Sequence, residues 1–289
     1  MPELPEVETV RRGLNNLIIG RTVKTVTSDT VRSFPNNPND VKTFLVSSKI
    51  VGVRRRAKVL LIDLSTNYTL VIHLKMTGQL VFIDNSSRFG AGHPNDSLVN
   101  SLPDKSTRVI IEFIDGSHLY FNDQRKFGWV KLIPTLEVPN IDFMKKVGPE
   151  PLEADFTAKQ FTDRFKRHPR TTIKAALLDQ SVIAGVGNIY ADESLWGAKI
   201  HPSRLVNTIT DTEFKKLYTE VRAVMNLSIE KGGSTNRNYV NAEGKKGSYM
   251  DFARVFRREG LECPRCGAEI IKIRVAGRGT HICPFCQKY

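Results

Sequence analysis

The sequence predicts an α+β protein in which one helix and a block of strands precede a helical region and a cysteine-rich tail. Three observations support this class. Residues 4–18 carry apolar side chains at helical spacing, residues 21–134 contain several short β-branched segments, and residues 157–231 return to helical spacing. Because runs of strands are followed by runs of helices, we expect segregated elements rather than a parallel α/β sheet.

The first helix is marked by apolar side chains that recur every three or four positions, at Val7, Val10, Leu14, Leu17 and Ile18. Gly20 follows the last of them, and glycine commonly ends a helix. Acidic side chains lie near its start, where the helix dipole favours anions. The three are Glu3, Glu6 and Glu8.

The strand region contains short segments rich in Val, Ile, Leu and Thr, at 21–28, 49–56, 58–65, 68–75 and 108–114. Several strands at this spacing are typical of a β-sandwich or barrel. Residues 84–104 are rich in Gly, Pro, Asn, Asp and Ser, and we expect them to form a loop that is a mobile insertion.

Prolines and a shift in pattern indicate the domain boundaries. We expect an N-terminal strand domain at 1–134, a linker at 135–147, a helical domain at 148–253 and a cysteine-rich finger at 254–289.

The chain is strongly basic, with 43 Lys and Arg against 30 Asp and Glu, a net charge of +13 and a pI near 9.6. This balance indicates a polyanionic partner, nucleic acid before an anionic membrane, although a merely solvated basic surface is the alternative. The sequence has neither a signal peptide nor an apolar run of about 18 residues, so we expect a cytoplasmic protein without a membrane partner.

Four cysteines form two Cys-x2-Cys pairs, at Cys263, Cys266, Cys283 and Cys286. This spacing is typical of a closed tetrahedral site for one structural Zn²⁺, with free thiols or two disulfides as the alternatives. Residues 269–275 between the pairs read as a strand, so we expect a zinc-bound β-hairpin. Arg278 lies at its glycine-flanked tip, as a phosphate ligand or as a solvated turn residue.

Pro2 follows the initiator methionine, and removal of that methionine leaves a secondary amine with a pKa near 7.7–8. Such an amine can attack a sugar's anomeric carbon and form an iminium, as a lysine Schiff base does. The neighbouring Glu3 could transfer protons. Proline is also an ordinary residue at the start of a helix, which is the simpler interpretation.

Several blocks, in order and over nearly the full chain, resemble the bacterial formamidopyrimidine-DNA glycosylase family. They are MPELPEVETVRRGL, RRRAK (54–58), HLKMTGQL (73–80), DQRKFG (123–128), GPEPL (148–152), LLDQSVIAGVGNIYADESLW (177–196), GGST (232–235) and GRGTHICPFCQ (277–287). The resemblance implies an N-terminal β-sandwich, a helix–two-turn–helix domain and a zinc-ribbon hairpin. It also implies double-stranded DNA with an oxidised base as partner, with the damaged nucleotide flipped out.

The resemblance also implies a role for each matching residue. Pro2 would be the nucleophile, Glu3 the general acid, Lys58 a lysine at the reacting nucleotide, and Arg278 a phosphate ligand and proton donor in the last elimination. Other matching positions have roles in holding DNA and the damaged base. Met76, Arg125 and Phe127 would fill the hole left by the flipped base, Lys174 and Asn188 would contact phosphates, and Gly233, Ser234, Thr235 and Tyr239 would close over the oxidised purine. The alternatives are ordinary core positions for Met76 and Phe127, and a simple surface loop for the segment that contains Tyr239.

The expected activity is therefore glycosylase and AP lyase chemistry on 8-oxoguanine and formamidopyrimidines, by β,δ-elimination, in a nucleoid-associated monomer. The alternatives are an endonuclease VIII-like enzyme for oxidised pyrimidines and a catalytically silent DNA-binding protein. The sequence departs from the family pattern at Ser106, where a histidine is usual, and Arg108 is a candidate substitute. Lesion ranking, opposite-base preference and DNA affinity are not determined by these residues.

Overall fold

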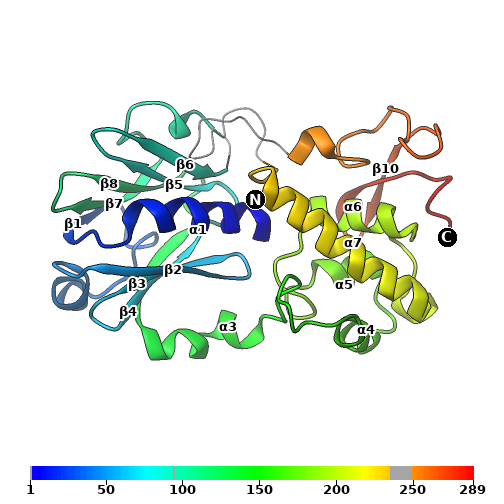
Figure 1. Ribbon diagram of the computed structural model, residues 1–289, viewed down its shortest axis with the longest axis horizontal. Coiled ribbons are helices and arrows are strands. Elements are labelled where there is room, and N and C mark those ends of the chain that lie inside the picture. The colour runs from blue at the N-terminus through cyan, green and yellow to red at the C-terminus, as the bar shows by residue number, and fades with distance from the viewer. Residues whose placement is uncertain (1, 94, 235–248) are drawn as a thin grey trace. The chain divides into compact units, whose positions relative to one another are not determined.

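The computed structural model describes residues 2–93, 95–234 and 249–289 (Figure 1). The chain forms two compact units. One contains Met1–Lys145 and Lys231–Ser248, and the other contains Lys146–Glu230 and Tyr249–Tyr289. The first unit is mostly strand and the second mostly helix, so the predicted α+β class is confirmed.

Two antiparallel sheets build the first unit, with strand orders β1-β7-β8-β5-β6 and β2-β3-β4-β9. The strands are β1 Val23–Ser28, β2 Ile50–Arg56, β3 Val59–Leu64, β4 Tyr68–His73, β5 Gly78–Ile83, β6 Arg88–Gly92, β7 Thr107–Phe113, β8 His118–Asp123 and β9 Trp129–Pro134. Alternate residues of both sheets, such as Leu60 and Ile62 on β3 and Phe121 on β8, belong to one buried apolar cluster. Two sheets that share one core in this way form the predicted sandwich.

Helix α1, Leu4–Ile18, packs against β2 of one sheet and β6 of the other (Figure 1). Its predicted apolar stripe is buried except for Leu17, which is half-buried. Gly13 faces the Phe89 ring of β6, and a Cβ there would lie 2.1 Å from that ring, so only glycine allows this approach. The helix thus holds the start of the chain firmly against the sandwich.

The prediction of a loop over 84–104 is wrong for part of this segment. Residues Arg88–Gly92 form β6, which pairs with β5, and Asp96–Leu98 form a short 3-10 helix. Phe89 and Ala91 point into the core, and the Arg88 side chain donates to the carbonyl oxygens of Leu98 and Asn100. Burial of an alternating pair outweighs the turn-rich composition that suggested a loop.

The segment at 135–147, expected as a linker, is folded onto the first unit. It forms a 3-10 helix, Thr135–Asn140, and α3, Asp142–Lys146. Val138 and Phe143 pack against Val59 and Leu61, which lie on the face of β3 that points away from the sandwich core. The apolar residues on both faces of β3 are therefore covered.

The second unit is built from α4 Ala158–Lys166, α5 Ile173–Leu178, α6 Asn188–Ala198 and α7 Asp211–Glu230. Strands β10 Ile271–Val275 and β11 Arg278–Ile282 form a hairpin that contacts α6. Its two-residue turn, Ala276–Gly277, has positive φ at both positions, as tight hairpin turns require.

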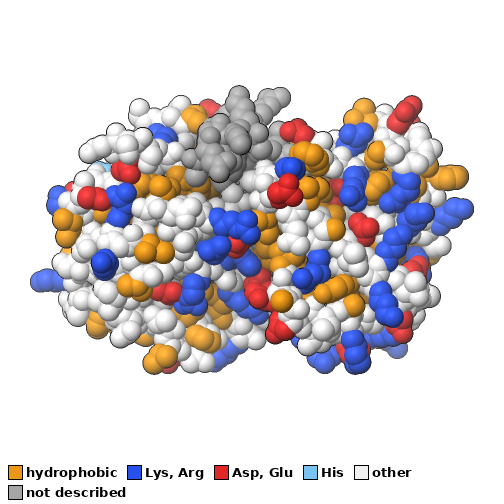
Figure 2. All heavy atoms as spheres, viewed as in Figure 1, with side chains coloured by type: hydrophobic (Ala, Val, Ile, Leu, Met, Phe, Trp, Pro, Cys, Tyr) orange, Lys and Arg blue, Asp and Glu red, His pale blue; other side chains and the backbone are white. Residues whose placement is uncertain are grey.

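Figure 2 shows Lys and Arg side chains on the visible face of both units, with acidic side chains between them. Net charge alone therefore does not locate a binding site. Among the helices that the structure describes, none is long and apolar enough to cross a membrane.

Candidate functional site

Pro2 and Glu3 lie immediately before α1, and both are buried. The backbone amide of Glu3 donates to Glu6 Oε2 over 2.7 Å, and the carbonyl oxygen of Glu3 accepts from the amide of Val7 over 3.0 Å. Glu3 itself is only 5 % exposed. The first helical turn thus holds the two residues that carry the predicted chemistry.

Lys58 lies in the tight turn between β2 and β3, next to Ala57, whose φ is +52°. Its side chain is 6 % exposed. The paired strand β4 ends at His73, opposite Val59. Burial, together with the charges of Lys75 and Lys58, lowers the pKa of His73 to about 3. At neutral pH His73 therefore adds no positive charge beside Lys58.

Met76 and Phe127 are large apolar side chains that remain exposed, at 39 % and 40 %. Met76 lies between β4 and β5, and Arg125 and Phe127 lie between β8 and β9. Because Gly78 pairs with Asp123 across β5 and β8, the two loops are neighbours. The Arg125 guanidinium lies 4.9 Å from the centre of the Phe127 ring. These three residues are therefore not core residues, which was the alternative for Met76 and Phe127.

Asp123 organises these two loops, and sequence reasoning did not single it out. Its carboxylate is fully buried. Oδ2 accepts from the amides of Phe127 and Gly128, over 2.8 and 2.6 Å, and Oδ1 accepts from the amide of Arg125 and the hydroxyl of Thr77. One buried carboxylate therefore fixes the backbone of the loop that carries Arg125 and Phe127, and links it to the neighbouring loop through the Thr77 hydroxyl. An Asp directly before a turn-rich segment is the signal that could have identified it.

The predicted lesion-closing loop begins beside α1. The amide of Ser234 donates to Glu6 Oε1 over 2.8 Å, and Gly233 has a φ of +92°. A Cβ on Gly233 would lie 3.3 Å from Glu6 Cγ. Thr235 and Tyr239, predicted for the same loop, lie outside the described residues.

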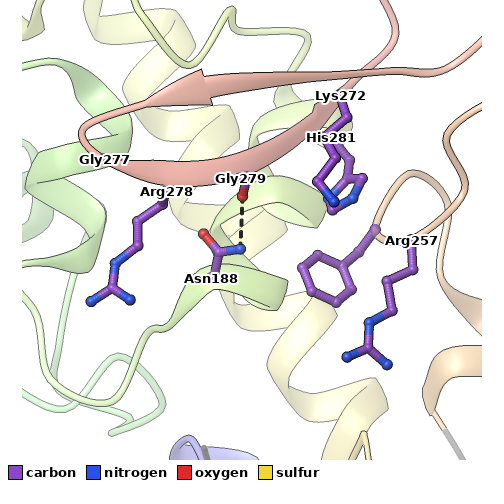
Figure 3. Close-up of a pocket in the computed structure, with 8 residues that line it drawn as sticks. Asn188, Arg257, Lys272, Gly277, Arg278, Gly279 and His281 are labelled. Carbon is purple, nitrogen blue, oxygen red and sulfur yellow. Dashed lines mark hydrogen bonds between the residues drawn. The ribbon is translucent and has the colours of Figure 1, made fainter.

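In the second unit, the start of α6 and the β10–β11 hairpin form an open pocket of about 400 Å³ (Figure 3). Asn188 is the first residue of α6, and its Nδ2 donates to the Gly279 carbonyl oxygen over 2.9 Å. Gly187, which precedes this helix, has no side chain that could cap it, and the positive end of a helix dipole favours an anion. Arg278 is exposed and lines the same pocket.

Lys174, also predicted as a phosphate ligand, is fully buried. Its ammonium donates to Asp192 over 2.6 Å and to the Thr280 hydroxyl over 2.7 Å. Asp192 in turn accepts from the amide of His281 over 2.9 Å. Lys174 thus supports β11 from behind, next to the segment that carries Arg278, and does not present its ammonium at the surface.

Glu193, the next residue of α6, holds the other wall of the pocket. Its carboxylate accepts from the successive amides of Arg254, Val255 and Phe256, and from the hydroxyl of Tyr249. Burial raises the pKa of this carboxyl group, and the three amides oppose that shift. Helix α6 therefore positions both β11 and residues 254–256.

Three family models match the chain in succession. They are the formamidopyrimidine-DNA glycosylase N-terminal domain over residues 1–130, the H2TH domain of the same enzyme over residues 147–240, and a zinc finger found in FPG and IleRS over residues 260–288. The chain belongs to the formamidopyrimidine-DNA glycosylase family. The resemblance stated from the sequence motifs is therefore confirmed.

Curated family members cover the whole chain. A formamidopyrimidine-DNA glycosylase of Pediococcus pentosaceus is 43% identical over 99% of both chains, and one of Pelotomaculum thermopropionicum is 42% identical over 100% of this chain and 99% of its own. Among solved structures, a Lactococcus lactis Fpg mutant in complex with Fapy-dG DNA has a TM-score of 0.87 and 35% identity, with both chains fully covered. The L. lactis enzyme with abasic-site DNA gives the same TM-score and identity over 99% of this chain and 100% of its own.

The cysteine positions fit the zinc finger of the family. The four sulfur atoms lie within 4.8 Å of one another, with separations of 3.9 Å between Cys263 and Cys286 and 3.4 Å between Cys266 and Cys283. Zn–S bonds of about 2.3 Å in a tetrahedron require sulfur separations of about 3.8 Å. One structural Zn²⁺ therefore fits these four ligands, as the spacing of the cysteines predicts.

The electrostatics of the four thiols agree with a metal. Although burial opposes it, hydrogen bonds from the amides of Arg265 and Cys266 lower the pKa of Cys263 to about 6. Burial and the neighbouring sulfur atoms raise the pKa of Cys286 to about 12. Ionisation of Cys286 is therefore unfavourable without a cation, and a bound Zn²⁺ would supply the positive charge that stabilises its thiolate.

The departure from the family pattern at Ser106 is a local rearrangement. Ser106 is buried and bonds to Asp104 and Ser97. Arg108 is also buried, and its guanidinium donates to Asp29 and to the carbonyl oxygens of Asp123 and Lys105. These bonds use the Arg108 guanidinium inside the fold, where it stabilises the ends of the strands. Arg108 was the candidate substitute for the histidine that is usual in the family, and its burial does not support that role.

Proposed function

We propose that this chain is a bifunctional DNA glycosylase and AP lyase that excises oxidised purines, 8-oxoguanine and formamidopyrimidines, from double-stranded DNA. The observation that carries the proposal is the buried Pro2–Glu3 pair at the start of α1, in a chain of the formamidopyrimidine-DNA glycosylase family. Relatives whose solved complexes contain Fapy-dG and abasic-site DNA support this substrate class.

In this mechanism the initiator methionine is removed and the Pro2 nitrogen attacks C1′ of the damaged nucleotide. The N–C1′ bond forms as the glycosidic bond breaks, and the base leaves with the bonding electrons. The Pro2 nitrogen loses its proton in this step and the departing base gains one. Glu3 protonates the sugar ring oxygen, which opens the ring and leaves an iminium between Pro2 and C1′. The position of Glu3 supports this role, because the residue follows Pro2 directly and is only 5 % exposed.

Elimination then cleaves the strand. Loss of a C2′ proton sends electrons into the iminium and expels the 3′ phosphate, and a second elimination expels the 5′ phosphate, leaving a one-nucleotide gap. Lys58 lies in a tight turn and would approach the reacting nucleotide. Arg278 would bind phosphate and donate the proton of the last elimination. The nucleophile, the general acid and Lys58 would thus lie in residues 1–134, and Arg278, which combines phosphate binding with proton donation, in residues 254–289.

The exposed loops of the first unit suit extrusion of the damaged nucleotide. Met76 and Phe127 would fill the space that the flipped base leaves, and Arg125 would hydrogen-bond the orphaned base opposite. Their exposure, and the rigid support from Asp123, favour insertion into a base stack. The loop of Gly233, Ser234, Thr235 and Tyr239 would close over the oxidised purine.

Phosphate binding in the second unit would depend on Asn188 and Arg278, together with the positive end of the α6 dipole. Lys174 would act as a positioning residue, since its ammonium holds Thr280 beside Arg278. The zinc finger would keep the hairpin rigid. A monomer in the cytoplasm, associated with the nucleoid, fits an enzyme whose substrate is chromosomal DNA.

Borohydride trapping tests the proposal. The purified protein is incubated with one duplex carrying 8-oxoguanine opposite cytosine and a second carrying an oxidised pyrimidine. We expect a covalent complex on the purine lesion, mapped to Pro2, and strong loss of excision with retained DNA binding in Pro2→Gly. Trapping on the pyrimidine lesion alone would support the endonuclease VIII-like alternative. Unchanged excision by Pro2→Gly would reject the nucleophile.

Oxidised pyrimidines are the second candidate substrate, because the L. lactis enzyme has also been solved with DNA that contains an oxidised pyrimidine. Absence of trapping on both duplexes, with DNA binding intact and the initiator methionine shown to be removed, would indicate the catalytically silent DNA-binding protein.

A further inference from the structure

The pocket at the start of α6 contains a second arginine that the family motifs did not indicate. Arg257 lines this pocket together with Asn188, Lys272, Arg278 and His281. In Figure 3 the side chains of Arg257 and Arg278 extend toward the same side of the pocket from two different segments, and Asn188 lies between them. Two guanidinium groups thus flank the start of α6, one on each side of Asn188.

The charges of this pocket are not equally available. Lys272 lies 3.5 Å from Glu259, and His281 Nε2 lies 3.3 Å from the same carboxylate. In contrast, no acidic side chain within the described parts of the chain pairs with the guanidinium group of Arg257 or Arg278. The positive charge that remains for a ligand is therefore concentrated on these two arginines.

The backbone at Arg257 has a positive φ, which is an unfavourable conformation for a residue other than glycine. Residues 255–258 form a turn in which the amide of Arg258 donates to the carbonyl oxygen of Val255 over 3.1 Å. Arg257 is the third residue of that turn and has a φ of +58°, a conformation that glycine adopts much more readily. The Glu193 carboxylate fixes the three preceding amides. Glycine would satisfy the turn, so what the arginine adds is its guanidinium group.

We propose that Arg257 is a second arginine ligand for a DNA backbone phosphate, acting with Arg278 and Asn188 at the start of α6. The planar guanidinium group donates in a fixed fork that matches phosphate oxygens, and the positive end of the α6 dipole favours the same charge. The Phe256 ring lies 5.8 Å from the Arg257 guanidinium, within the range of a cation–π interaction. The inference rests on the proposed function, because it assumes that DNA is the partner.

The test is the affinity for a duplex carrying a tetrahydrofuran abasic analogue, which binds but cannot form an iminium. Fluorescence anisotropy is measured between about 50 and 200 mM salt. Arg257→Gly should raise Kd about tenfold and reduce the slope of log Kd against log salt by about one, as expected for loss of one phosphate contact. Arg257→Gln should do the same while keeping a side chain in the strained turn.

Urea unfolding of the same variants shows whether weaker DNA binding comes from a less stable fold. Because glycine relaxes the positive φ, Arg257→Gly should unfold in urea at a midpoint no lower than that of the parent. Lys216→Gln, which removes one exposed charge from α7 outside the pocket, should keep the parent's affinity and salt slope.

The outcomes separate this inference from the proposed function. If the parent binds the duplex and both Arg257 variants bind with the same Kd and salt slope, the phosphate contact by Arg257 is wrong and the proposed function stands. If the parent does not bind duplex DNA, both are wrong. Weaker binding by Arg257→Gly together with a lower urea midpoint, but normal binding by Arg257→Gln, would assign the effect to the turn and also overturn the inference.

Discussion

The carboxylate of Glu6 accepts a hydrogen bond from the backbone amide of Ser234 over 2.8 Å, although 228 positions separate the two residues. The other oxygen of the same carboxylate accepts from the amide of Glu3. One side chain on α1 therefore holds both the residue proposed as general acid and the beginning of the loop proposed to close over the lesion. Substitutions at Glu6 should consequently lower the rate of base excision more than the rates of the elimination steps.

Glu6→Gln should slow excision of 8-oxoguanine about 10- to 100-fold, because an amide cannot accept both hydrogen bonds and a bond to a charged acceptor contributes about 1.5–3 kcal/mol. Incision of a preformed abasic site should fall much less, since no base remains for the loop to hold. Single-turnover rates on the two substrates measure the difference. Equal losses on both substrates would contradict the assignment of Glu6 to the loop.

Asp123→Asn should disturb the two loops that carry Met76 and Phe127. The amide nitrogen of asparagine would face backbone amides that now donate to Oδ2, so we expect a loss of about 1–3 kcal/mol in the free energy of unfolding. Excision should slow at least tenfold, and the preference for the base opposite the lesion should weaken. Urea denaturation and rates against all four opposite bases measure these effects.

Thr77→Ser is the control for this change, because it keeps the hydroxyl that donates to Asp123. It should retain the parent's opposite-base preference. An Asp123→Asn protein with unaltered preference would show that the loops do not depend on this carboxylate.

His73 should make stability depend on pH below neutrality. Its folded-state pKa is lowered to about 3, against about 6.5 in an unfolded chain, so the unfolded state binds more protons between these values. Stability therefore rises with pH through this window and is lost as the pH falls below about 6.5. His73→Asn removes this contribution, while its side-chain oxygen can still accept from the amide of Lys75.

Between pH 7 and pH 5 the parent should lose about 2 kcal/mol more of its free energy of unfolding than His73→Asn loses. Urea denaturation at the two pH values measures this difference. Equal losses in the two proteins would show that His73 titrates normally in the folded state.

Zinc removal should weaken DNA binding through the hairpin. Cys266→Ser leaves three thiol ligands, so we expect metal content to fall well below one Zn²⁺ per chain and Kd for duplex DNA to rise at least tenfold. Metal analysis and anisotropy measure the two effects. Phe285→Ala, an exposed position between Cys283 and Cys286, should keep the zinc. Full zinc content in Cys266→Ser would contradict the four-ligand site.

Elements with a clear local period were predicted from the sequence. The stripe of α1, strands β1, β2, β3, β4 and β7 of the sandwich, and the helices from 157 to 231 form where their side-chain spacing places them. Strand β6 and the folded segment at 135–147 were missed for the opposite reason. Their few apolar residues, Phe89, Ala91, Val138 and Phe143, become significant only against partners from distant strands and from α1.

The partners of buried polar groups could not be predicted from the sequence either. The sequence identified Lys174 and Arg108 as cations for DNA, but both have partners inside the fold, Asp192 for one and Asp29 for the other. A buried charge must find a hydrogen-bonding partner, and the position of that partner along the chain follows no period. Asp123 and Glu193, which hold the functional loops, were overlooked because their partners are backbone amides, which the sequence does not mark.

The sequence by itself determined the order of the elements, the four zinc ligands and the residues that carry the proposed chemistry, Pro2 and Glu3. These depend on residue type and on separations of a few positions. Only the tertiary structure decided which arginines face the pocket at α6 and which acidic groups hold its walls. It also decided that Glu6 holds the start of the loop at 233–234. Such contacts join segments far apart in the chain, and their free energy depends on burial and geometry that arise only when the core has formed.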